Sequence, residues 1–114
     1  FVVSALTVAV VAVNLVAGVV VDRENIVHEL VVEGRFQSPL DFDWIPGDVE
    51  RIIICEKRGI IHLAIDGQIQ SKPFLDISDQ LISTGSRGLT GCLIDVDFDN
   101  NRFLYVSYVD NRAR

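Results

Sequence analysis

From residue 22 onward, the sequence consists of short apolar runs separated by turn residues, with no amphipathic helix of convincing length. The β-branched run at 51–55 predicts a strand that is buried on both faces. A second run alternates, with Leu40, Phe42 and Trp44 on one face and two aspartates on the other, as a half-buried strand does. Such a chain is restricted to an all-β fold.

The turn residues divide the sequence into strands of similar length. Asp66-Gly67 is a strong signal for a tight hairpin turn, because both residues tolerate the left-handed backbone that this turn requires. We expect strands at 26–32, 39–45, 51–55, 60–65, 89–94 and 103–108, a short edge strand at 68–71, an extended stretch at 73–77 and a helical turn at 79–83.

The strand pattern repeats within the chain. Aligning Arg51 with Arg102 pairs the apolar run 52–55 with 103–106, a spacing of 51 residues. Repeats of about 40–50 residues built only of short strands are typical of propeller blades. The sequence thus offers one blade and the first two strands of a second. Because each blade needs neighbours on both faces, we expect the N-terminal part of a longer protein.

Residues 1–21 carry no charged side chain. This length suits a membrane anchor, and it also suits a secretory signal peptide with a cleavage site at Val16-Ala17-Gly18. A pair of buried strands is a third interpretation, favoured by the many valines. Under the first two, 22–114 is exported to the extracellular or periplasmic side: anchored to a membrane through 1–21 in the first case, and secreted in the second.

The charged residues and the cysteines bound the function further. Sixteen acidic against ten basic side chains give a net charge of −6, which argues against a nucleic-acid partner. Cys55 and Cys92 each lie in an apolar run, which favours two small buried thiols. A disulfide is the alternative, and it requires Cα atoms within about 7 Å of each other.

Several motifs occur in a characteristic order along the chain. They are ICEKRGII at 54–61, PFLDIS at 73–78, GSRGLTG at 85–91, the acidic turn DVDF at 95–98 and the aromatic strand FLYVSY at 103–108. Together they resemble the glucose/sorbosone dehydrogenase family. The resemblance implies a six-bladed β-propeller that binds pyrroloquinoline quinone (PQQ) and oxidises a sugar hydroxyl with hydride transfer to the quinone. It also implies that the general-base histidine lies downstream of Arg114.

The resemblance, which covers about 26–108, assigns Ser86 and Arg87 to cofactor binding. Arg87 would meet an anionic cofactor such as the tricarboxylate of PQQ, or would instead tie the turn to a neighbouring blade through carbonyl groups. Ser86 stands where the family's dehydrogenases usually carry Gln or Glu. This difference favours the alternative of a non-catalytic propeller that binds a protein ligand, as hedgehog-interacting-type proteins do. A small β protein on a membrane anchor is a third hypothesis.

The cluster Glu56-Lys57-Arg58 is interpreted as structural. Glu56 is expected to accept hydrogen bonds from backbone or arginine within the strand layer, whereas Lys57 and Arg58 are expected in solvent. The sequence predicts no catalytic residue within the chain.

A metal site is not expected in this segment either. The acidic turn starts like a calcium loop, but Asn100 and Val106 occupy the positions that should be Gly and Glu. If the whole protein binds calcium, it does so elsewhere. His28 and His62 lack a third ligand for zinc, and neither is assigned as the general base.

Overall fold

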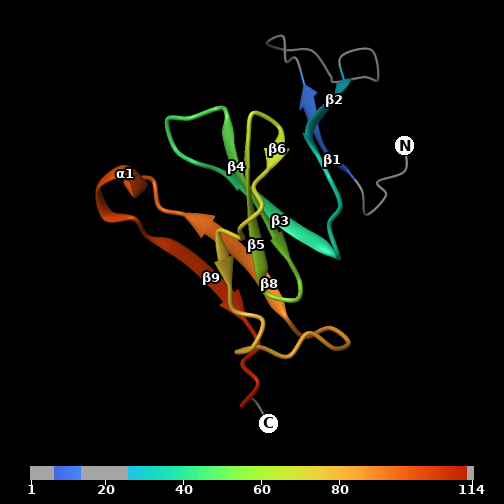
Figure 1. The fold of residues 1–114 in the computed structure, drawn as a ribbon, viewed down its shortest axis with the longest axis vertical. Coiled ribbons are helices and arrows are strands. Elements are labelled where there is room, and N and C mark those ends of the chain that lie inside the picture. The colour runs from blue at the N-terminus through green and yellow to red at the C-terminus, as the bar shows by residue number, and fades with distance from the viewer. Residues whose placement is uncertain (1–6, 14–25, 113–114) are drawn as a thin grey trace, which may run out of the picture.

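The computed structural model describes residues 7–13 and 26–112, and the predicted all-β fold is confirmed (Figure 1). The strands predicted at 60–65 and 89–94 have the observed bounds. The other predicted strands differ by one or two residues at their ends, where pairing stops. The described elements are β1 Thr7–Val13, β2 Ile26–Glu33, β3 Pro39–Trp44, β4 Arg51–Glu56, β5 Ile60–Ile65, β6 Gln68–Ile69, β7 Leu75–Asp76, β8 Leu89–Ile94, α1 Phe98–Asn101 and β9 Leu104–Tyr108.

Most of the strands form one sheet in the order β1-β2-β6-β5-β4-β3, with β7 paired to β5. The predicted hairpin turn between β5 and β6 is confirmed, with positive φ at Asp66 (50°) and Gly67 (77°). The prediction that the following strand is an edge was wrong. Glu33 of β2 pairs in parallel with Gln68, and its N–H donates to the Gly67 carbonyl at 3.1 Å.

Part of the uncharged N-terminal segment is described, and it is a strand. β1 pairs antiparallel with β2 from Thr7↔Glu33 to Val13↔Ile26, so its partner strand lies outside 1–21. The proposed cleavage site lies outside the described residues. Within the described part of the chain, no helix has the length and apolar character needed to cross a membrane. Cleavage or anchoring of 1–21 stays a prediction.

Strand β4 forms the centre of the core, and the predicted burial on both faces is confirmed. Ile53 and Cys55 pack towards β8 and β9, whereas Ile52 and Ile54 pack against Phe36 and other residues on the opposite side. The hairpin β8–β9 therefore lies across one face of the first sheet (Figure 1).

The joint between β3 and β8 is made by carboxylates. Asp41 Oδ2 accepts a hydrogen bond from the Cys92 backbone N–H at 3.1 Å, and Asp43 Oδ2 accepts one from the Ile94 N–H at 2.9 Å. The predicted alternation of β3 is confirmed, but the acidic side chains face the core layer. Their apolar neighbour Phe42 remains 42 % exposed.

The two cysteines form a disulfide, so the favoured prediction of two free thiols was wrong. Cys55 on β4 and Cys92 on β8 are both buried, and their Cα atoms lie 6.8 Å apart. The packing of the two hairpins brings together residues that are 37 positions apart in sequence. Sequence could not show this proximity, because it depends on how the two layers stack.

The internal repeat is confirmed, but its residue alignment is corrected. The pairs of the β3–β4 hairpin recur in the β8–β9 hairpin when β3 is shifted by 50 residues and β4 by 52. Thus Pro39↔Glu56 corresponds to Leu89↔Tyr108, and both hairpins have their register shift at the equivalent place. A uniform shift of 51 would place each side chain on the wrong face of its strand.

This correspondence gives each hairpin two equivalent faces. We call the forward face the one that, in the first hairpin, is turned towards β8. In the first hairpin this face carries Asp41, Asp43, Ile53 and Cys55, and β8 covers it. In the second hairpin the equivalent positions are Gly91, Leu93, Tyr105 and Ser107. The first hairpin and its neighbours thus form one blade, and β8–β9 begins the next.

Candidate functional site

The glycine-rich turn is pressed against the end of β4. Leu89 N–H donates to the Lys57 carbonyl at 2.8 Å, and the Val109 N–H donates to the Gly88 carbonyl at 3.0 Å. Gly88 has φ of 132°, and a Cβ there would lie 2.5 Å from the Lys57 carbonyl oxygen. Only glycine permits this approach, so the turn is fixed to the first blade through its backbone.

The two predicted cofactor-binding residues project from this turn. Ser86 and Arg87 are both exposed, and the Arg87 N–H closes the turn by donating to the Thr84 carbonyl at 3.1 Å. Gly85, the residue before them, accepts a hydrogen bond from Lys57 Nζ. The structure therefore brings Ser86 and Arg87 close to the end of β4 and leaves both side chains accessible.

Lys57 belongs to this site, which the sequence interpretation missed. It was expected in solvent, whereas it is only partly exposed and its ammonium group contacts the turn. A hollow of about 160 Å³ lies beside the turn, and Lys57 and Arg58 contribute its cationic side chains. The remaining lining residues are Gln37, Ser38 and Ser83. The sequence signal for this role is that Lys57 lies two residues after the buried run 51–55 and belongs to the motif at 54–61, one of the family motifs that precede the glycine-rich segment.

Glu56 is structural, as predicted. Its side chain is 1 % exposed and accepts hydrogen bonds from the Gln37 N–H at 2.7 Å and from Arg58 Nε at 2.5 Å. His62 Nε2 lies 3.2 Å from Glu56 Oε1 without the alignment of a hydrogen bond, and its ring packs edge-on against Phe36. These contacts place His62 on the Phe36 side of the sheet, opposite the face that β8 and β9 cover.

The acidic turn after β8 is stabilised by its own hydrogen bonds. Asp95 accepts one from the Asp97 N–H at 2.8 Å and one from the Tyr105 hydroxyl at 2.7 Å. The Asp97 N–H, then the Tyr105 hydroxyl, lower the pKa of Asp95, and Asp95 in turn raises the pKa of Tyr105. Among the residues that the structure describes, no cluster of three potential metal ligands occurs.

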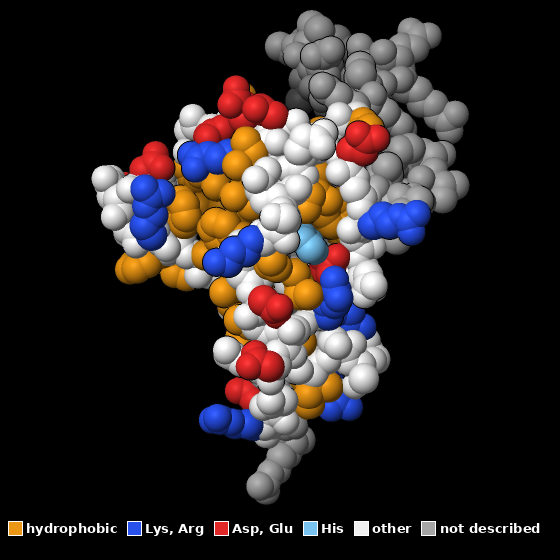
Figure 2. Space-filling view, viewed as in Figure 1, with side chains coloured by type: hydrophobic (Ala, Val, Ile, Leu, Met, Phe, Trp, Pro, Cys, Tyr) orange, Lys and Arg blue, Asp and Glu red, His pale blue; other side chains and the backbone are white. Residues whose placement is uncertain are grey.

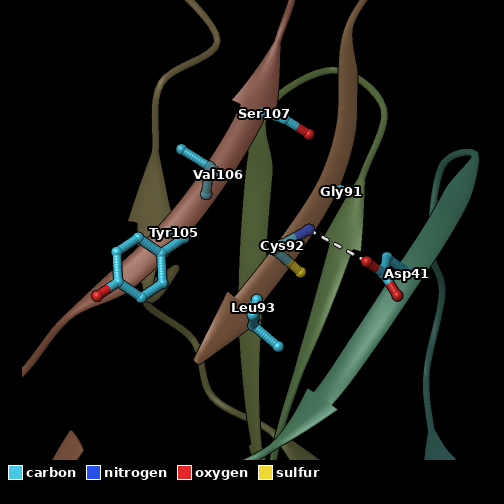
Figure 3. A pocket seen from close by; sticks show the side chains of 7 residues that line it. All are labelled: Asp41, Gly91, Cys92, Leu93, Tyr105, Val106 and Ser107. Atoms are coloured by element: carbon cyan, nitrogen blue, oxygen red, sulfur yellow. Dashed lines mark hydrogen bonds between the residues drawn. The ribbon is translucent and has the colours of Figure 1, made fainter. Parts of the chain in front are cut away.

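An open groove of about 320 Å³ follows the forward face of the second hairpin (Figure 3). It extends from Asp41 on β3 across Gly91 to Leu93 and Tyr105, which are 59 % and 51 % exposed. On the face of the molecule seen in Figure 2, apolar side chains gather among acidic and basic ones, and no single sign of charge dominates. The groove therefore lies on the exposed side of the second hairpin, and Asp41 is the one charged residue among the described residues that line it.

The residues at the turn fit one edge of a polycarboxylate cofactor. Lys57 uses one of its three N–H donors on Gly85, and Arg58 uses Nε on Glu56, which leaves further donors on both side chains. Arg87 adds a third cation that is exposed on the same turn. Cationic groups of this kind pair readily with carboxylates.

Comparison with known proteins agrees with the order of motifs along the chain. The family model for glucose/sorbosone dehydrogenase matches residues 36–114. No curated protein sequence and no solved structure gives a significant match. The matched region runs from the end of β2 through both hairpins and includes the whole glycine-rich turn.

Proposed function

Because the chain belongs to the glucose/sorbosone dehydrogenase family, we propose that the natural protein oxidises a hydroxyl group of a sugar, with an aldose as substrate. PQQ, when bound, supplies the acceptor for the hydride. The observation that carries the proposal is the glycine-rich turn, whose close approach to the end of β4 places Lys57 at the Gly85 carbonyl and leaves Arg87 exposed on the same turn.

In this proposal the residues of the chain bind and orient the cofactor. Arg87 and Lys57 donate hydrogen bonds to its carboxylates, and Ser86 donates one from its hydroxyl group. The exposure of Ser86 and Arg87 supports such a role, because neither side chain has to break a core contact to reach a ligand. Proton removal from the sugar is assigned to a group outside the described residues.

The test measures PQQ binding and dye reduction by the natural protein that contains this chain. Arg87→Gln should weaken PQQ binding about tenfold or more, since it removes a charge-assisted hydrogen bond. Arg112→Gln, an exposed arginine elsewhere on the chain, is the matched control and should bind normally. Equal affinity in the two variants would remove Arg87 from the site.

A non-catalytic, protein-binding propeller is the second candidate function. The observation that favours it is Ser86, whose side chain is shorter than the Gln or Glu usual at this position in the family's dehydrogenases. In that case the exposed turn contacts a protein ligand, as in hedgehog-interacting-type relatives. Absence of PQQ binding together with absence of aldose-dependent dye reduction would favour this function.

We also propose that the protein is exported. The disulfide supports this, because disulfides persist in oxidising compartments outside the cytoplasm. Thiol labelling in denaturant, on protein isolated without reductant, should find Cys55 and Cys92 unreactive until a dithiol is added. Labelling of both thiols before reduction would contradict export.

A further inference from the structure

The Cys55–Cys92 disulfide joins the two blades close to the glycine-rich turn. Cys55 lies on β4, two residues before Lys57, which contacts the turn. Cys92 follows Gly91, the last residue of the glycine-rich segment. Both cysteines are buried, with 0 % and 8 % exposure. The disulfide therefore crosses the layer between the blades directly beside the candidate site.

Every described contact between this turn and β4 depends on the spacing of the two blades. The Leu89 N–H reaches the Lys57 carbonyl at 2.8 Å, and Lys57 Nζ reaches the Gly85 carbonyl. A hydrogen bond weakens steeply when its partners move by a few tenths of an ångström or tilt. A covalent bond within three residues of both Lys57 and Leu89 limits such movement.

We propose that this disulfide is a positioning element of the cofactor site, holding the segment 85–91 against Lys57 at the end of β4. Loss of the disulfide should lower affinity for an anionic ligand and leave the first blade folded. The identity of the ligand rests on the proposed function, whereas the positioning role does not.

The expected effect is local because each strand keeps its own sheet partners. β4 stays paired with β3 and β5, and β8 stays paired with β9. Two electrons and two protons from a dithiol break only the S–S bond, giving two thiols while the dithiol becomes a disulfide. Across the joint, Asp41 and Asp43 still accept hydrogen bonds from the backbone N–H groups of residues 92 and 94.

Hydrogen exchange on the natural protein tests this role without reference to activity. In the Cys55→Ala/Cys92→Ala variant, amides of 85–91 should exchange about tenfold faster, while those of β4 and β5 change less than about twofold. Val106→Ala is the matched control, because it removes a side chain from the same core and keeps the disulfide. It should leave the exchange of 85–91 unchanged.

Titration with PQQ separates this inference from the proposed function. The double variant should show a PQQ Kd about tenfold higher than the natural protein. If PQQ binds neither protein, the proposed function fails, and the exchange data still decide the positioning role. Should the double variant not fold, dithiol treatment of the natural protein gives the same comparison. The positioning role would be overturned if loss of the disulfide did not accelerate amide exchange in 85–91, or accelerated it equally in β4 and β5. It would also be overturned if Val106→Ala accelerated exchange in 85–91 to the same extent.

Discussion

Replacing Asp43 tests whether carboxylates join the first two blades. Its Oδ2 accepts the Ile94 N–H at 2.9 Å, and Ile94 is only 3 % exposed. Asp43→Ala leaves that N–H buried without an acceptor, at a cost of about 1.5–3 kcal/mol for a bond to a charged group. Asp43→Asn keeps a neutral acceptor and should lose about 0.5–1.5 kcal/mol.

Hydrogen exchange at the Ile94 amide, measured on the whole natural protein, gives a direct readout. A loss of this size should accelerate exchange in Asp43→Ala about 10- to 150-fold. Asp99→Ala is the control, since this side chain is 71 % exposed and lies 3.9 Å from Arg102. The joint is disproved if Asp43→Ala and Asp99→Ala exchange alike at Ile94.

Further changes test the remaining contacts. Gly88→Ala should destabilise by about 1–3 kcal/mol in thermal unfolding, because its Cβ would meet the Lys57 carbonyl; Gly85→Ala, with open space around its Cβ, should cost less. The contribution of Asp95, whose pKa is lowered, should be present above about pH 4 and lost as pH falls through its folded pKa. The contribution to stability of Tyr105, whose hydroxyl has a raised pKa, should be present below about pH 10 and lost as pH rises through its folded pKa. In a pH titration of stability, Tyr105→Phe should abolish this loss at high pH.

Strand positions were predictable because they depend on local patterns. The β-branched run of β4 and the turn at Asp66-Gly67 each contain their own signal, and both were located correctly. The family motifs likewise placed Ser86 and Arg87 on one turn. Their roles in ligand binding stay predictions, since no ligand contact is described.

The contacts between blades were not predictable from sequence, because they depend on how two layers stack. Asp41 and Asp43 read as a polar face, yet they are buried in part because β8 has backbone N–H groups that need acceptors. The cysteine pairing failed for the same reason. Lys57 was placed in solvent because its partner, the Gly85 carbonyl, comes from a different blade.

The forward faces of the two hairpins have different chemistry, and this difference bears on which hairpin can dock on each face. The positions of Asp41 and Asp43 in the first hairpin are taken by Gly91 and Leu93 in the second. A hairpin with the backbone of β8 would find no carboxylate acceptors if it docked on the forward face of the second hairpin. Each of its two amides that bond to Asp41 and Asp43 in the native arrangement would then lose about 1–3 kcal/mol of stabilisation. Neighbouring blades can therefore recognise each other during folding, so that similar repeats avoid mispairing.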